Sequence, residues 1–223
     1  MFYKSSHHVF RVPELDLFPW LDHGFGTRNS DDWLDQTPVA SLRQIHSSIS
    51  LIAAANQHGC LGEGDALVTA QPGLMVSVRT ADCVPILLVD ARNRAVAAIH
   101  AGWRGVASHI IAAPIEQMRA VFSTRWQDLH AALGPAIGPC CYQVGVEVQQ
   151  RLAPWWPELS IPQQPRNVDL RETIRRQLVQ AGIPVEQIYS SFACTRCHPA
   201  DFHSFRRDGD AAGRMISAAG IRA

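Results

Sequence analysis

Short runs of apolar residues, separated by polar segments, recur along most of the chain. Such continuous runs are typical of strands that are buried on both faces of a sheet. They predict strands at Ile49–Ala53, Ala66–Thr69, Leu74–Val78, Pro85–Val89, Ala95–Ile99 and Leu129–Leu133. The polar segment Asp90–Arg94 separates two of these runs and predicts a hairpin.

Two longer segments have the apolar spacing of helices. One is Val106–Val121, and the other is Val168–Gln180, in which Leu170, Ile174 and Leu178 recur every four residues. Asn167 is the expected N-cap of the second helix, and Gly182 is expected just past its end. Hairpins mixed with helices predict an α+β fold, a layered α/β sandwich around a mixed β-sheet.

The domain organisation is predicted to be simple. We find no repeat and no Gly/Ser linker, and the proline-rich segment Pro154–Pro165 reads as a turn-rich surface loop. Residues 1–223 are therefore expected to form a single domain.

Composition narrows the class of protein. Of the 223 residues, 47% are hydrophobic and 18% are charged, which excludes a disordered chain. The 20 basic and 20 acidic residues balance, so the excess of positive charge typical of nucleic-acid binding is missing. The sequence also has neither an apolar run long enough for a membrane span nor the pattern of a signal peptide. We expect a cytoplasmic protein whose six cysteines are thiols or metal ligands.

Reactive side chains are concentrated where the predicted strands end, which is where sites are commonly built. The segments concerned are Gln44–Ser47, Gly64–Thr69, Arg79–Pro85, Ile99–Gly105 and Cys194–Gly209, together with the Gly- and Pro-rich segment Leu133–Tyr142.

Three of these segments supply a candidate metal site made of His46, Cys83 and His100. Imidazole and thiolate suit Zn²⁺, and three protein ligands leave a fourth position that can polarise an oxygen or activate water. The three residues are far apart in sequence, so no ligand spacing supports the group. Each taken alone also fits a structural role.

Cys194 and Cys197, in the order Cys-x-x-Cys-His, allow several interpretations. They match a haem attachment site, a redox dithiol, or half of a structural zinc site completed by Cys140 and Cys141. The adjacency of Cys140 and Cys141 makes the last arrangement awkward. Unliganded thiols in a loop are the simplest expectation.

Several acidic and basic residues fall in the same segments and form a candidate anion-binding and acid/base set. They are Asp65, Asp82, Arg79, Arg104, Arg206 and Arg207. Arginine donates paired hydrogen bonds to phosphate, and a helix that starts near Val106 would favour an anion at its N-terminus. Ordinary surface ion pairs would explain the same residues.

These segments, in this order, resemble the laccase-domain family. Its members were once described as multicopper polyphenol oxidoreductases and later as zinc-dependent purine nucleoside phosphorylases. The matching stretches span residues 23–209 and read HGFGTR, LRQIHS, GDALVT, RTADCVPILLVD, AAIHAGWRG, LGPAIGPCCYQVG and CTRCHPADFHSFRRDG.

The resemblance implies a single α/β sandwich domain and a catalytic zinc held by His46, Cys83 and His100. It implies phosphorolysis of adenosine, inosine, guanosine and 5′-methylthioadenosine, with some adenosine deamination. Purine nucleosides and phosphate would be the partners, with no nucleic acid, membrane or obligate protein partner. The sequence departs from the family after HGFGTR, where NSDDW replaces a Gly-rich turn.

Within that activity, further residues receive expected roles. Arg28, Arg79 and Arg104 are candidate phosphate partners, and Asp65 or Asp82 is a candidate proton shuttle for deamination. A copper phenol oxidase fits poorly, because such enzymes need many closely paired histidines. A metal-dependent amide hydrolase in cell-wall precursor editing and a non-catalytic thiol or zinc module remain open.

Overall fold

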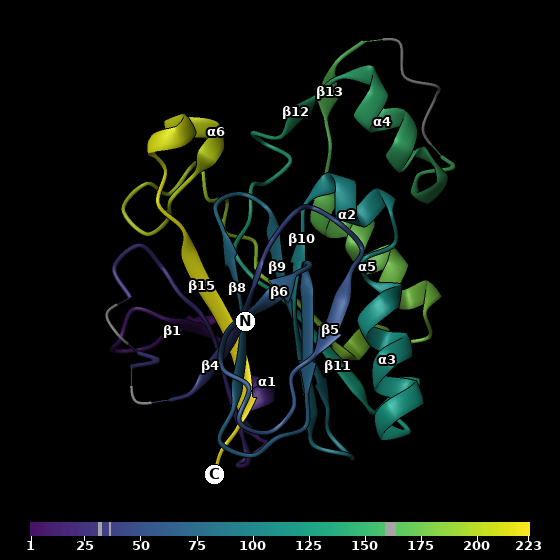
Figure 1. Ribbon diagram of the computed structural model, residues 1–223. Helices are drawn as coiled ribbons and strands as arrows, with labels where there is room; N and C mark the ends of the chain where they lie inside the picture. The colour runs from purple at the N-terminus through teal and green to yellow at the C-terminus, as the bar shows by residue number, and fades with distance from the viewer. Residues whose placement is uncertain (31–32, 36, 159–163) are drawn as a thin grey trace.

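The computed structural model describes residues 1–30, 33–35, 37–158 and 164–223. Within these residues the chain forms two mixed β-sheets that face each other, and helices cover the outer face of one of them (Figure 1). The architecture is of the α+β class that the sequence predicts. The strands, however, are divided between two mixed sheets, whereas the sequence suggested one.

The first sheet is seven-stranded in the described part of the chain and is mostly antiparallel. Only β4 runs parallel to its neighbours β8 and β6. In spatial order its strands are β1 (Tyr3–Lys4), β2 (Phe10–Arg11), β3 (Leu21–Phe25), β15 (Met215–Ile221), β8 (Met75–Thr80), β4 (Val39–Arg43) and β6 (Gly59–Glu63).

The second sheet carries most of the predicted strands. Its spatial order is β14 (Ile188–Ser190), β11 (Leu129–Leu133), β9 (Val84–Asp90), β10 (Ala95–Ala101), β7 (Ala66–Thr69) and β5 (Ser50–Ile52). The expected hairpin is present, with Ala95 opposite Asp90 in the antiparallel β9–β10 pair. The two edge strands, β14 and β5, are parallel to their neighbours.

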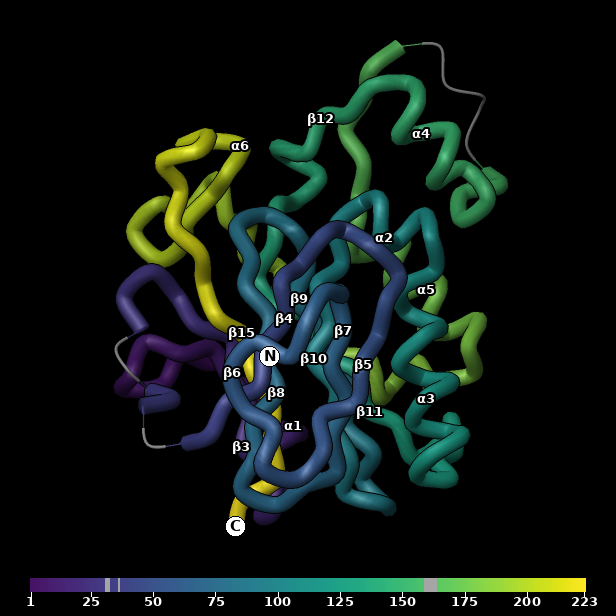
Figure 2. The backbone as a smooth tube through the Cα atoms, viewed as in Figure 1, coloured from purple at the N-terminus to yellow at the C-terminus, as the bar shows by residue number. Residues whose placement is uncertain are grey.

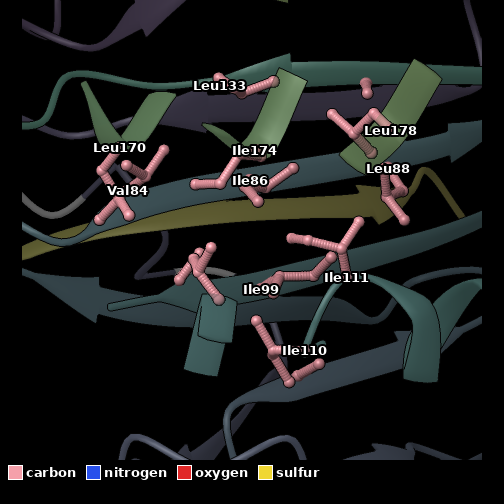
Figure 3. Packing of buried hydrophobic residues seen from close by; sticks show 14 of the residues in the cluster. Val84, Ile86, Leu88, Ile99, Ile110, Ile111, Leu133, Leu170, Ile174 and Leu178 are labelled. Carbon is pink, nitrogen blue, oxygen red and sulfur yellow. The ribbon is translucent and has the colours of Figure 1, made fainter. Parts of the chain in front are cut away.

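Strands β9 and β10 are buried along their whole length, as their apolar runs predict. Successive side chains of a strand point to opposite faces. Ile86 and Leu88 pack with Ile174 and Leu178 of a covering helix (Figure 3). Leu87 and its neighbours on the other face pack with residues of the first sheet. The second sheet is therefore the central layer of three.

The described residues form six α-helices, whereas the sequence predicted two. They are α1 (Pro13–Asp16), α2 (Trp103–Ala107), α3 (Ala112–Phe122), α4 (Val146–Leu152), α5 (Leu170–Gln180) and α6 (Phe205–Asp208). The single helix predicted over Val106–Val121 is wrong, because α2 and α3 are separate. His109 between them has a φ of 61°, which no α-helix contains. Pro114 also lacks the N–H that a continuous helix would pair with Ile110.

Helix α5 occurs where the apolar spacing predicts it, but its N-cap is Asp169. The Asp169 carboxylate accepts a hydrogen bond from the backbone N–H of Glu172 at 3.0 Å. Asn167, the expected cap, belongs to β13 (Arg166–Asn167), and its amide donates to the carbonyl of Pro139. Gly182 has a φ of 94° just after the helix, as expected of a residue that stops it.

A small lobe extends beyond the ends of the two sheets. It consists of α4 and the two-stranded ribbon of β12 (Gln143–Val144) and β13 (Figures 1 and 2). A proline-rich loop was predicted over Pro154–Pro165. Its described residues follow α4 or precede β13, and residues 159–163 lie outside the described part of the chain. No helix of the described residues is both long and apolar enough to cross a membrane.

Candidate metal centre and cleft

His46, Cys83 and His100 converge although they come from different parts of the chain. Their potential ligand atoms all lie within 4.8 Å of one another, and the Cys83 Sγ is 3.9 Å from the His46 Nε2. Cys83 immediately precedes β9, and His100 lies on the paired strand β10. His46 follows β4 in a turn, with a φ of 58°. The strand ends thus assemble the group.

A buried carboxylate holds this group in place. One oxygen of Asp65 is 2.7 Å from the His100 Nδ1 and accepts the backbone N–H of His46 at 3.0 Å. The other oxygen accepts the backbone N–H and the hydroxyl of Ser47 at 2.6 and 2.7 Å. Burial acts to raise the pKa of Asp65, but the hydrogen bonds from His100 and Ser47 outweigh it and lower the pKa to about 2.

The electrostatics of the group favour a charged cysteine. Burial opposes ionisation of Cys83, yet hydrogen bonds from His100 and His46 outweigh it and lower the pKa to about 6. Burial likewise opposes protonation of His100, but its contacts with Asp65 and Cys83 raise the pKa to about 9. Without a metal, the cysteine would be a thiolate beside an imidazolium. The thiolate is the form that binds metal ions.

The surroundings of the group also fit a metal ion. Asp65 pairs with the Nδ1 of His100, which leaves the Nε2 for a metal, as in many histidine–metal sites. Gly102 lies against the group: a Cβ there would come within 2.8 Å of His46 and 3.1 Å of the Cys83 Sγ. The two histidines and the cysteine are therefore suited to metal binding, and Gly102 fits against them because it has no side chain.

Asp82, next to Cys83, is held by groups from the C-terminal part of the chain. Its oxygens accept hydrogen bonds from the hydroxyls of Thr195 and Ser204 and from the backbone N–H of Arg206, at 2.6, 3.1 and 2.6 Å. Its φ is 94°. These contacts favour a role for Asp82 in positioning the chain at Cys83.

A cleft of about 870 Å³ opens over the group. Two of the expected phosphate partners, Arg79 and Arg104, line it, but Arg28 is not among the lining residues. Arg28 instead donates to the carbonyl of Pro199. Asp65 is fully buried and is also absent from the lining.

The cleft is completed by residues that were not predicted from the sequence. Arg214 adds a guanidinium group, and Trp103, Tyr142 and Phe205 add aromatic surface. The position of Arg214 results from the pairing of β15 with β8, in which Met215 is opposite Thr80. No local signal identifies it. The described lining residues include four arginines (Arg79, Arg104, Arg206 and Arg214) and one residue with a carboxylate, Asp82.

The structure also brings the remaining candidate thiols together. The sulfur atoms of Cys140, Cys141, Cys194 and Cys197 all lie within 4.8 Å of one another. This second group is suited to metal binding as well. Cys60 is exposed on β6 and belongs to neither group.

The chain is similar in sequence to proteins named for reactions of purine nucleosides. The chain is 38% identical over 159 residues to the purine nucleoside phosphorylase of Bacteroides thetaiotaomicron, a match that covers 69% of this chain and 59% of that protein. The chain thus spans less than two thirds of this relative. It is 40% identical over 188 residues to adenosine deaminase RL5 from an unknown prokaryotic organism, covering 82% of this chain and 70% of that protein.

The fold itself matches a solved structure. The crystal structure of YlmD from Geobacillus stearothermophilus superimposes with a TM-score of 0.90 at 27% identity, covering 100% of this chain and 99% of that one. Residues 28–222 match the family model described as multi-copper polyphenol oxidoreductase laccase. Because this model matches most of the chain, the chain belongs to the multi-copper polyphenol oxidoreductase laccase family.

Proposed function

We propose that this protein is a zinc-dependent purine nucleoside phosphorylase, which splits adenosine, inosine, guanosine or 5′-methylthioadenosine with phosphate. The observation that carries the proposal is the placement of His46, Cys83 and His100 in a cleft lined by arginines. The name of the relative from Bacteroides thetaiotaomicron, purine nucleoside phosphorylase, supports the same reaction.

The metal is assigned from the donor set. Two imidazoles and one thiolate suit Zn²⁺ and leave a position free for an exogenous ligand. When bound there, zinc would supply Lewis-acid stabilisation of negative charge on a substrate oxygen. Copper phenol chemistry is less well supported, because the group offers only two histidines.

Phosphate is assigned to the arginines. Phosphorolysis passes through an oxocarbenium-like state, so the enzyme has to hold a phosphate anion close to the anomeric carbon. Arg79 and Arg104 can donate paired hydrogen bonds to that anion. The guanidinium of Arg104 also lies 4.7 Å from the Trp103 ring, which limits its freedom.

The purine is assigned to the aromatic part of the cleft. Tyr142 and Phe205 offer surfaces on which a flat heterocycle can pack. Arg206 lies over the Tyr142 ring at 5.2 Å and donates to the carbonyl of Gln143. Burial raises the pKa of Tyr142, so its hydroxyl stays protonated and can donate to an acceptor.

Asp65 and Asp82 are assigned different roles. Asp65 orients His100 and the turn that carries His46, and it is too deeply buried to reach a substrate. Asp82 lines the cleft, so it is the better placed of the two for the proton transfer that deamination requires. The relative named adenosine deaminase favours this second activity as a side reaction.

The test is an assay of purified, zinc-loaded protein with inosine and phosphate. We expect hypoxanthine and ribose 1-phosphate, with no base released when phosphate is omitted. Cys83→Ala should abolish turnover and metal binding at this group, whereas Cys60→Ala serves as the matched control. Adenosine without phosphate tests for deamination to inosine. Absence of any purine product from the loaded protein would refute the proposal.

The phosphate assignment has its own test. Arg104→Ala should raise the KM for phosphate more than the KM for the nucleoside, because loss of ground-state binding changes KM with little effect on kcat. Arg92→Ala, an exposed arginine in the β9–β10 loop, is the control. An unchanged phosphate KM in Arg104→Ala would remove Arg104 from this role.

A further inference from the structure

Four cysteines from two separate loops meet beside the second sheet. Cys140 and Cys141 lie in the irregular segment that follows β11, and Cys194 and Cys197 lie in the segment that follows β14. These two strands are parallel neighbours, so their C-terminal ends point the same way. The Cys197 Sγ is 3.3 Å from that of Cys141 and 3.7 Å from that of Cys140.

We propose that these four cysteines bind a second zinc ion, in a closed structural site distinct from the cleft. Zinc–thiolate bonds of about 2.3 Å in a tetrahedron place neighbouring sulfurs about 3.8 Å apart. The separations of 3.3 and 3.7 Å, with all four sulfurs within 4.8 Å of one another, match one ion at the centre. They are too long for disulfide bonds, which measure about 2.05 Å. An iron–sulfur cluster would need a wider group, because its own atoms separate the thiolates.

The backbone explains how adjacent cysteines can both point inward. Gly138 and Cys141 close one turn, in which the Cys141 N–H donates to the Gly138 carbonyl at 2.9 Å. Cys194 and Cys197 close a second turn in the same way at 3.1 Å. The Gly138 N–H also donates to the Cys194 Sγ at 3.2 Å, a contact typical of bound thiolates. The two turns thus face each other with their thiols between them.

A buried cation offsets the charge of the thiolates. A Cβ on Gly138 would lie 3.2 Å from a guanidinium nitrogen of Arg171 and 3.3 Å from the Cys140 Sγ, so both groups border this glycine. Arg171 is itself buried and donates to the Ala193 carbonyl at 3.0 Å. Cys140 and Cys197 are exposed, which gives a metal ion a route into the site.

The second ion would stabilise one side of the cleft. Cys141 is followed by Tyr142, a cleft residue, and Cys194 is followed by Thr195, whose hydroxyl donates to Asp82 at 2.6 Å. Asp82 in turn precedes Cys83. An ion that joins the two turns would therefore fix the segments that hold Tyr142 and Cys83. The four thiolates fill its coordination, so the ion has no place for a substrate.

Metal analysis of the full-length protein, purified under reducing conditions with zinc, tests this directly. We expect about two zinc ions per chain in the wild type, and about one each in Cys83→Ala and Cys197→Ser, since each variant loses one site. Cys60→Ser should keep about two. Cobalt-loaded Cys83→Ala should retain intense thiolate-to-cobalt absorption. A wild type with about one ion, which Cys83→Ala loses, would overturn the proposal.

A second measurement avoids dependence on any variant. Alkylation of the native wild-type protein, followed by peptide mass spectrometry, reports each cysteine separately. With zinc present, the four cysteines should be protected and Cys60 should react. A chelator should make Cys140, Cys141 and Cys197 reactive, because only Cys194 is buried by the protein itself. Equal labelling with and without the chelator would overturn the proposal. So would a disulfide between Cys141 and Cys197 in the zinc-loaded, reduced preparation.

Discussion

Replacement of Asp65 by asparagine tests how the candidate metal group is held. The change keeps the size of the side chain but removes its charge and one acceptor oxygen. One carboxylate oxygen of Asp65 accepts from two donors, on His46 and His100. The other accepts from three, which are the backbone N–H and hydroxyl of Ser47 and the backbone N–H of Ile45. Whichever way the asparagine turns, its NH₂ group faces at least two donors in a buried position.

The magnitude follows from those contacts. A hydrogen bond to a charged group contributes about 1.5–3 kcal/mol, so the loss of two costs about 3–6 kcal/mol of stability. For a chain of this size that is a fall in Tm of roughly 6–24 °C. Because His100 also loses the partner that orients its ring, zinc affinity should fall by about 10- to 100-fold.

The assay combines thermal unfolding of the metal-free protein with competition for zinc against a chromophoric chelator. Asp90→Asn is the matched control, because Asp90 is equally buried and accepts hydrogen bonds from Arg92 and Asn93. It lies at the far end of β9 from Cys83, about 20 Å away by the rise of a strand. The control should lose stability and keep its zinc affinity. Wild-type zinc affinity in Asp65→Asn would refute the reasoning.

Two further predictions concern packing and pH. Gly102→Ala should lower the zinc content, because its Cβ would fall 2.8 Å from His46 and 3.1 Å from the Cys83 Sγ. Gly145→Ala is the control and should keep its zinc, because a Cβ there meets nothing within 4 Å. Equal zinc content in the two variants would contradict the predicted clash. His23 is buried with its Nε2 accepting the Val12 N–H, and burial lowers its pKa to about 4. The unfolded chain, with a pKa of about 6.5, binds the proton more readily, so this stabilisation is complete above that pH and is lost as the pH falls toward 4. Urea unfolding should therefore show that His23 contributes about 2 kcal/mol less to the free energy of unfolding at pH 5 than at pH 7. The variant His23→Gln should lose this part of the pH dependence. If the variant has the same pH dependence as the wild type, His23 is not its source.

Much of the central sheet could be predicted from the sequence. Strands β7, β9, β10 and β11 lie within two residues of the predicted bounds, because a strand buried on both faces must be apolar at every position. Most strands of the first sheet were not predicted. Strands such as β15 (MISAAGI) and β3 (LDHGF) mix glycine and polar residues with apolar ones. Their sequences therefore show neither the alternation of a half-buried strand nor the continuous apolar run of a fully buried one.

The three members of the candidate metal group, His46, Cys83 and His100, could also be selected from the sequence, because each lies close to an end of a predicted strand. Their convergence could not, because it depends on the pairing of β9 with β10 and on the turn that Asp65 fixes after β4. The N-cap of α5 shows the same limit at short range. Asn167 and Asp169 are both good caps, and only the path of the backbone decides between them.

The tertiary structure alone decided which arginines line the cleft and which cysteines lie together. The sequence offered Arg28 as a phosphate partner beside Arg79 and Arg104, yet Arg79 and Arg104 line the cleft and Arg28 does not. Cys140 and Cys197 meet because β11 and β14 are parallel neighbours, a pairing between segments far apart in the chain. Local apolar patterns determined which segments became buried strands. The order and register of those strands, which depend on contacts between distant residues, determined which side chains share a site.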